Sequence, residues 1–536
     1  MQAATQTWGP AIGATDKWCA RCMPCLTDLA FVLPIFFLFG RLSGTKILFG
    51  DGDTGWQIRT GEWILSHRAV PTEDFFSFTK LHHAWFAWEW GWDLLFAVIH
   101  KFWGLGGVAF VNVMILGVIS VLLYKLALRA SGNELASFFV TTLAICGSSS
   151  HWLARPHLLS WLLFLLFLHL IRDLQEGRRR ALYLLPAVAV VWANVHPSFF
   201  VGPLLLFLAT VERALQQFID GRAWLAIFNK CRPLLWTTAI CSLVSLLNPY
   251  TWRLYVHIFV FLYSGLANNM QEYQPVNFHK SPAGVFECML LLGTGSVFWS
   301  LRWRSANSTV SILFWSHMAL LAIRNVPLFL MIAAPATAKM LSHIATRSTI
   351  PRLGDVQATI SQISKDIRFF ERRRHVHALA GLATIAVAGL FASGAPGFEG
   401  QFSSSLFPVT AVPTVAASRG ERIFASDQWG AYLIYRLYPA KKVFVDDRVD
   451  LYGRDLSMAA GDIQNARNNW RYQLNQFAVD MVIIKPDAPL AAELKVSPGW
   501  VTLFDDGKAI VFQAKLSRMQ NPDLRTDRRS LRSGVL

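Results

Sequence analysis

The chain has 536 residues, of which 53% are apolar and only 16% are charged, and its formal net charge is +16. Apolar runs recur from Leu26 to Ala392, which excludes an ordinary water-soluble protein over this part and predicts a membrane protein. The net charge alone could indicate nucleic-acid binding, but the basic residues are divided among loops between apolar runs, so we expect no nucleic-acid partner.

The apolar runs predict a polytopic bundle of helices. A helix that crosses the hydrocarbon core needs roughly 20 apolar residues, with about 17 as a lower limit. The sequence contains about eleven candidates, near residues 26–42, 106–124, 134–148, 157–171, 181–195, 198–212, 234–248, 283–301, 309–323, 326–342 and 376–393. No cleavage-site pattern follows the first run, so it is interpreted as a retained anchor.

The positive charges predict the orientation of these spans. Arginine and lysine gather in alternate loops, around residues 125–129, 172–180, 213–232, 302–304 and 347–374. The positive-inside rule makes those loops cytoplasmic. We therefore expect residues 1–25 inside, residues 26–393 as the membrane domain, and residues 394–536 outside as a periplasmic or extracellular domain.

The first outer segment, residues 43–105, carries the most distinctive chemistry. Asp51 and Asp53 lie one residue apart between Gly50, Gly52 and Gly55, whose backbone freedom would let both carboxylates face one ligand or ion. The alternative is a solvated turn with an aspartate that caps the helix expected from about Trp56. The rest of the segment is rich in tryptophan and predicts two amphipathic pieces at the membrane surface.

Further polar residues fall on the same predicted outer face. They occur in the strings "WLARPH", "WANVHP", "NPYTWR", "EYQP" and "RNVP", and the candidates for substrate binding are Arg155, His157, His196, Arg253, Glu272 and Arg324. Each arginine could instead form a structural ion pair, and each histidine could pack against a helix end.

Cysteine suggests little. Cys19, Cys22 and Cys25 form a C-x-x-C-x-x-C string near the N-terminus, but a zinc site needs a fourth ligand that the neighbouring sequence does not supply. The outer domain has no cysteine, so disulfides cannot stabilise it.

The C-terminal domain is expected to be a small α/β unit. Short β-rich runs occur at 422–425, 442–445, 481–484 and 509–512, and helical patterns at 430–438 and 462–477. The acidic loop from Asp446 to Asp450 follows its strand directly, where loops often carry ligand groups. A salt-bridged structural turn is the favoured interpretation of that loop, and the domain is expected to recognise an acceptor or cover the membrane site.

These strings together resemble a known family. An inner span followed by an outer acidic loop with two amphipathic helices is similar to the GT-C superfamily of membrane glycosyltransferases. "GDTGWQIRTGEWILSHRAVPTEDFFSFT" and "HAWFAWEWGWDLLFA" resemble a bacterial multi-pass group related to the protein mannosyltransferases of glycosyltransferase family 39. "ARPHLLSW", "WANVHPSFFVG", "LNPYTWRLY", "EYQPVNFH", "IRNVPLF" and "VFVDDRVDLYG" follow in the same order, so the resemblance spans nearly the whole chain. This sequence departs from the group at Gln57, where relatives usually carry histidine.

The resemblance implies transfer of a sugar from a polyprenyl-phosphate donor to a glycan, lipid or protein acceptor at the outer face. An acceptor hydroxyl must lose its proton as it attacks, and Asp53 is the first candidate for that base, with Asp51 second. The leaving phosphate needs cationic partners, for which Arg155 and Arg324 are the best candidates and Arg253 a third. A divalent cation bridging Asp51 and Asp53 stays open. The alternatives are a transporter or flippase, which would place charges near the bilayer midplane, and a non-catalytic membrane scaffold.

Overall fold

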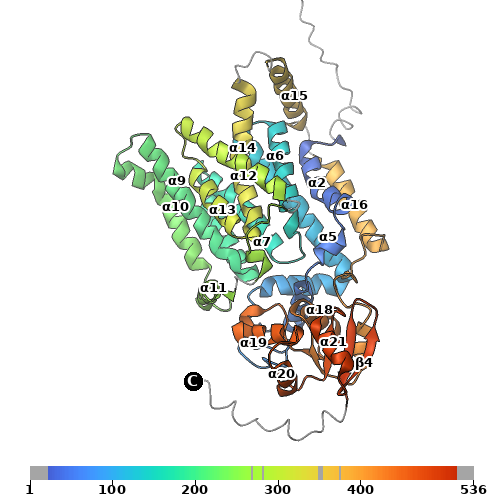
Figure 1. The fold of residues 1–536 in the computed structure, drawn as a ribbon. Helices are drawn as coiled ribbons and strands as arrows, with labels where there is room; N and C mark the ends of the chain where they lie inside the picture. The colour runs from blue at the N-terminus through green and yellow to red at the C-terminus, as the bar shows by residue number, and fades with distance from the viewer. Residues whose placement is uncertain (1–21, 267–269, 280–282, 348–353, 373–375, 516–536) are drawn as a thin grey trace, which may run out of the picture.

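A long helical bundle and a smaller α/β domain make up the molecule (Figure 1). The computed structural model describes residues 22–266, 270–279, 283–347, 354–372 and 376–515, so Cys19 and parts of the predicted 347–374 loop and of the terminal segments lie outside the described residues. The bundle contains α2 (Leu26–Gly40), α3 (Thr45–Leu48), α4 (Asp53–His67), α5 (Trp90–Ser131), α6 (Glu134–Gly147), α7 (His157–Gln175), α8 (Ala181–Val195), α9 (Val201–Ile219), α10 (Trp224–Val244), α11 (Arg253–Tyr263), α12 (Ala283–Arg302), α13 (Thr309–Leu321), α14 (Val326–Arg347), α15 (Gly354–Arg372) and α16 (Ala378–Ser393).

Each predicted span coincides with a helix of this bundle. By length and composition, five helical segments of the described chain could cross a membrane: Trp90–Ser131, His157–Gln175, Pro197–Ile219, Ala283–Arg302 and Ile323–Ala345. Leu26–Gly40, Ala181–Val195, Arg253–Tyr263, Thr309–Leu321 and Ala378–Ser393 are shorter apolar helices. The chain is thus a mostly helical, multi-pass membrane protein, and the number of its spans stays a prediction.

Helix α5 joins the first outer segment to the bundle. Gly104 interrupts it with φ 59° and ψ −162°, a conformation that residues with a side chain rarely adopt. Residues 90–103 therefore form a separate piece that packs with α4, and residues 105–131 form the first long helix after α2. The two amphipathic helices expected in segment 43–105 are α4 and this first half of α5.

Short 3₁₀ turns precede several bundle helices and carry much of the polar chemistry. They are η1 (Ser148–His151) before α7, η2 (Pro197–Phe200) before α9, η4 (Gln271–Tyr273), and η5 (Ile323–Asn325) before α14. These turns contain or adjoin five residues that the sequence singles out: Arg155, His157, His196, Glu272 and Arg324.

The C-terminal domain is a five-stranded mixed sheet with helices. The strand order is β2 (Lys442–Val443), β1 (Arg422–Phe424), β3 (Met481–Ile484), β5 (Ile510–Ala514), β4 (Trp500–Asp505). Strands β1, β2 and β3 are parallel, whereas β5 is antiparallel to β3 and β4. Its helices are α17 (Val412–Ala417), α18 (Asp427–Leu437), α19 (Val449–Gln464), α20 (Trp470–Gln476) and α21 (Pro489–Val496).

Two local predictions for this domain are wrong. The helix expected over 462–477 is two helices, because α19 ends at Gln464 and α20 begins at Trp470, with Ala466 and Asn468 at positive φ between them. Strand β4 has no predicted counterpart, although four of its six residues are apolar; its side chains from Val501 to Asp505 are largely exposed. The four predicted strands all occur.

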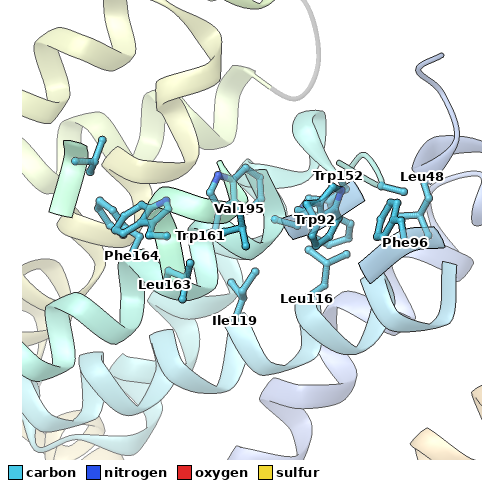
Figure 2. Close-up of a cluster of buried hydrophobic side chains, with 14 of the residues drawn as sticks. Leu48, Trp92, Phe96, Leu116, Ile119, Trp152, Trp161, Leu163, Phe164 and Val195 are labelled. Carbon is cyan, nitrogen blue, oxygen red and sulfur yellow. The ribbon is translucent and has the colours of Figure 1, made fainter. Parts of the chain in front are cut away.

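A continuous apolar core links segment 43–105 to the bundle (Figure 2). In Figure 2, Trp92 of α5 lies beside Trp152, and Leu48 and Phe96 lie at the same end of the cluster. The cluster continues through Leu116 and Ile119 of α5 toward Phe164 of α7. Burial of these large side chains holds the start of α4, the loop after η1 and the first half of α5 in fixed relative positions.

Candidate active site at the junction of the bundle and the C-terminal domain

Three carboxylates from two distant parts of the chain meet at the junction. Asp51 and Asp53 lie at the N-terminus of α4, and Asp447 lies in the loop after β2. One carboxylate oxygen of each lies within 4.8 Å of one oxygen of the other two. We call Asp51, Asp53 and Asp447 the acidic cluster.

The backbone around the cluster fits tightly against the C-terminal domain. The Gly52 N–H donates to Oε1 of Gln428 on α18 at 3.0 Å. A Cβ atom at Gly52 would lie 2.5 Å from the Gln428 carbonyl oxygen and 2.8 Å from Cβ of Ala431. Glycine is therefore required for this close approach, which explains its place between the two aspartates.

Local hydrogen bonds fix the two aspartates of segment 43–105. Oδ1 of Asp51 accepts the backbone N–H of Asp53 at 2.9 Å, which satisfies an amide at the start of α4. Oδ1 of Asp53 accepts Nε1–H of Trp56 at 3.0 Å. Asp51 thus accepts the first amide of α4, but the segment is not the solvated turn of the alternative interpretation, because both carboxylates are buried and face Arg155.

Arg155 bridges the pair. Its Nη1 lies 2.9 Å from Oδ2 of Asp51, and its Nη2 lies 2.6 Å from Oδ2 of Asp53. The loop before α7 is held beside the acidic segment by two hydrogen bonds, from the Ala154 N–H to the Leu48 carbonyl and from Thr54 Oγ1 to the Ala154 carbonyl, both 2.8 Å. One guanidinium therefore neutralises part of a three-carboxylate cluster.

A chain of charges continues from Arg155 to Arg324. Nη1 of Arg155 lies 3.8 Å from Oε2 of Glu272, and Oε1 of Glu272 accepts Nη1–H of Arg324 at 3.0 Å. The Arg324 guanidinium also lies over the Tyr273 ring, 4.4 Å from its centroid. Burial is the largest single influence on Glu272 and favours its neutral form, but the charges of Arg324 and Arg155 and the contact with His151 together hold the pKa of Glu272 below its ordinary value.

Within the acidic cluster, by contrast, burial raises the pKa values of two carboxylates. Desolvation raises the pKa of Asp53 to about 7, against the opposing effect of Arg155. Burial, followed by the charges of Asp53 and Asp51, raises the pKa of Asp447 well above its ordinary value. A carboxylate with a pKa near neutrality can both take up and release a proton at working pH.

A further buried carboxylate, Glu89, lies one helical turn along α4 from Asp53, beside Gln57. Oε2 of Glu89 accepts Nε2–H of Gln57 at 2.7 Å, and Oε1 of Glu89 lies 3.6 Å from Nε2 of His196. Burial raises the pKa of Glu89 to about 8, so it is mainly protonated at neutral pH. Gln57 is thus a neutral hydrogen-bond donor to Glu89.

The remaining predicted residues lie at different distances from the cluster. Nε2 of His157 contacts the His151 carbonyl at 2.7 Å, so its described contacts position the η1 turn. Arg253 lies apart from the acidic cluster, at a separate cavity beside Trp88 and Asp450. One continuous network of ion pairs joins Asp51, Asp53, Arg155, Glu272 and Arg324. Arg253 is not part of this network among the described residues.

The sequence does not predict that Asp447 lies beside Asp51 and Asp53. The loop from Asp446 to Asp450 was interpreted as a salt-bridged turn, and this holds for Asp446 and Arg448. Arg448 donates to both Asp446 and Asp74, with Nη2 2.7 Å from an oxygen of each. Asp447 lies between Asp446 and Arg448 in sequence, but its carboxylate lies near those of Asp51 and Asp53 instead. The feature of the sequence that indicates a ligand-binding role for this loop is its position directly after the predicted strand at 442–445.

The acidic cluster has the donor set that a hard divalent cation prefers. Mg²⁺ and Mn²⁺ bind carboxylate oxygens, and three carboxylates converge here. The Arg155 guanidinium is paired with two of them, Asp51 and Asp53. Oδ2 of Asp447 is buried without a hydrogen-bond partner among the described residues. Such an oxygen suits a metal ligand.

No protein family model and no curated protein matches the chain. Solved structures do match it. The apo oligosaccharyltransferase of Archaeoglobus fulgidus has a TM-score of 0.54 at 10% identity, over 92% of this chain and 74% of that one. Oligosaccharyltransferase AglB from the same organism, solved with an inhibitory peptide and a dolichol-phosphate, gives 0.52 at 10% identity, over 93% and 74%. Apo ArnT from Cupriavidus metallidurans gives 0.50 at 13% identity, over 94% and 99%.

These likenesses confirm the predicted fold. A match over nine-tenths of the chain covers both the helical bundle and the C-terminal domain. At such low identity it is the fold that is shared, and the activity has to be argued from the site.

Proposed function

We propose that this chain, which has the GT-C fold of AglB and ArnT, transfers a sugar from a polyprenyl-phosphate donor to an acceptor at the outer face of a bacterial inner membrane. The observation that carries the proposal is Asp53, a buried carboxylate with a pKa of about 7 held between Arg155 and Trp56. A dolichol-phosphate is bound to the AglB structure, which supports a lipid phosphate as the donor class.

The proposed chemistry assigns roles to the residues of the network. As the acceptor oxygen attacks the anomeric carbon, its proton passes to a carboxylate oxygen of Asp53. The bond between the anomeric carbon and the phosphate oxygen breaks, and the lipid phosphate leaves with a growing negative charge. Arg324 is the proposed phosphate ligand, because it is paired with one carboxylate, Glu272, whereas Arg155 is paired with both aspartates. Asp51 and Arg155 orient Asp53, and Glu272 orients Arg324.

The proposal assigns supporting roles to the histidines and leaves room for a cation. His196, next to Glu89, is proposed to line the substrate space, and His157 to hold the turn that carries Arg155. A divalent cation on Asp51, Asp53 and Asp447 would supply positive charge near the leaving phosphate.

The first prediction concerns Asp53→Asn. Loss of a general base costs about 10²–10⁴ in rate, so transfer should collapse while the amide keeps the hydrogen bond to Trp56. Asp51→Asn should be milder if Asp51 only orients its neighbour. The measurement is sugar transfer by the purified full chain from extracted polyprenyl-phosphate sugars, with membrane insertion checked for each variant.

Asp455→Asn is the matched control, because Asp455 is an exposed carboxylate on α19. Near-normal transfer in Asp53→Asn together with loss in Asp51→Asn would mean that Asp51 is the base. Normal transfer in both variants would remove the mechanistic basis of the proposal and favour a membrane scaffold.

A further inference from the structure

The cavity beside Arg253, which is separate from the acidic cluster, is used by none of the steps above. It has a volume of about 340 Å³ and lies between segment 43–105, α11 and the start of α19. Aromatic rings from Trp85, Phe86, Trp88 and Trp252 form much of its wall. Its polar groups come from Arg253, His257 and Asp450.

The polar groups of this cavity are held in place by one another. Asp450 accepts Nε1–H of Trp88 at 3.1 Å and lies 3.5 Å from Nε2 of His257. The His257 and Trp88 rings are stacked, with centroids 3.8 Å apart. The Arg253 guanidinium makes no hydrogen bond or ion pair with the described part of the chain, so its donors are available to a ligand.

We propose that this cavity, the aromatic pocket, binds a sugar ring of a saccharide acceptor; the proposal rests on the function proposed above. A pyranose has apolar C–H faces that pack on aromatic rings and hydroxyls that both donate and accept hydrogen bonds. Trp252 is 62% exposed and presents such a surface at the rim. Asp450 can accept from hydroxyls, and Arg253 can donate to them.

The charge and size of the pocket argue against the donor phosphate. Asp450 would repel the anionic phosphodiester of the donor, whereas one carboxylate and one guanidinium together suit a neutral polyhydroxyl ligand. Ligand pockets begin at about 300 Å³, so this one has room for a small ring system and not for a polyprenyl chain.

Contacts place the pocket close to the proposed base. The ring of Trp85, in the pocket wall, lies 6.1 Å from that of Trp56, whose Nε1–H donates to Asp53. Asp447 of the acidic cluster, in the loop after β2, and Asp450 of the pocket, in the first turn of α19, are three residues apart in sequence. An acceptor ring in the pocket would therefore lie within a few side chains of Asp53.

The test uses the full chain in lipid nanodiscs and the methyl glycosides of glucose, mannose and N-acetylglucosamine as probes. Saturation-transfer NMR should show transfer to the ring C–H protons of at least one glycoside. The signal should fall to background in Trp252→Ala and Asp450→Asn. It should persist in Tyr263→Ala and Asp455→Asn, which change an exposed aromatic on α11 and an exposed carboxylate on α19 away from the pocket. Absence of a signal with every glycoside, or an equal signal in the pocket variants, overturns the proposal.

Further outcomes separate the two proposals. Loss of the glycoside signal on addition of inorganic phosphate would make the pocket a donor site and overturn the acceptor assignment. Glycoside binding should persist in Asp53→Asn, because it needs no catalysis. If binding is normal but the wild-type chain transfers no sugar, the proposed function fails and the pocket stands as a saccharide site. If Asp53→Asn abolishes transfer while Trp252→Ala and Asp450→Asn keep the wild-type acceptor KM, the pocket assignment fails alone.

Discussion

At the scale of single residues, the environment gives similar carboxylates different roles. Asp53 and Glu272 both contact arginine and both are largely buried. Desolvation is the largest influence on both, but at Asp53 it exceeds the opposing charge of Arg155 and the pKa rises to about 7, whereas at Glu272 the combined effects of Arg324, His151 and Arg155 exceed it and the pKa falls. Asp53 is therefore suited to exchange protons, and Glu272 is suited to remain a fixed anion that orients Arg324.

The pH dependence of transfer follows from Asp53. The base must be ionised to accept a proton, so activity should fall about tenfold per pH unit well below the pKa of about 7 and reach a plateau above it. A bound cation favours the ionised carboxylate and should move the profile to lower pH. The measurement is the rate of a single turnover at saturating donor between pH 5 and 9. With divalent cations removed by a chelator, a flat profile from pH 5.5 to 8 would exclude Asp53 as the titrating base.

At the scale of elements, the loop after β2 joins the C-terminal domain to the bundle. Phe78 donates its N–H to the Val443 carbonyl at 3.1 Å, so segment 43–105 runs beside strand β2. Arg448 donates to Asp74 of the same segment and lies over the Trp85 ring, 4.4 Å from its centroid. These contacts hold the loop rigidly, and the loop in turn positions Asp447 against Asp53.

The cation prediction belongs to this loop. Mg²⁺ or Mn²⁺ should raise the melting temperature of the full chain by a few degrees, because a ligand bound only to the folded state stabilises it. Asp447→Asn should abolish that shift, and it should raise the metal-free melting temperature because it removes a carboxylate repelled by Asp53 and Asp51. The measurement is thermal unfolding followed by intrinsic tryptophan fluorescence. An unchanged cation shift in Asp447→Asn, with Asp455→Asn as control, would place the cation elsewhere.

At the scale of the whole molecule, the two ends of the bundle differ in chemistry. The C-terminal domain, segment 43–105 and the acidic cluster lie at one end, and α15 lies at the opposite end (Figure 1). At the end of the bundle where α15 lies, basic residues of the predicted cytoplasmic loops form ion pairs: Arg129 with Glu176, and Arg368 with Glu134. Two chemically distinct ends are what the charge pattern predicts for a protein with one fixed orientation.

The orientation itself is tested by reporter fusions. Alkaline phosphatase joined after Arg180 should be inactive, and a fusion after Ser418 in the C-terminal domain should be active, because the enzyme folds only outside the cytoplasm. Fluorescent-protein fusions at the same positions should give the reverse pattern. Strong phosphatase activity after Arg180 would invert the topology and place the acidic cluster on the cytoplasmic side.

The helices and most strands could be predicted because their signals are local. Apolar runs determined where α2, α7 and α14 lie, since the backbone of a span must satisfy its own hydrogen bonds. The GT-C fold was predicted from ordered motifs along the chain and is confirmed by the structural likeness to AglB and ArnT. Failures such as the helix over 462–477 occur where positive-φ residues interrupt an otherwise continuous pattern.

The composition of the site was decided by the tertiary structure. Asp51 and Asp53 were recognisable from their spacing, but nothing local indicates that Asp447 joins them or that Arg253 faces a different cavity. The Gly52–Gln428 hydrogen bond joins residues 376 positions apart, and such a contact depends on how two independently folded surfaces fit. Hydropathy and charge determine where a single helix lies, because each segment interacts with lipid or water by itself. Which distant side chains meet depends on the packing of all the elements between them.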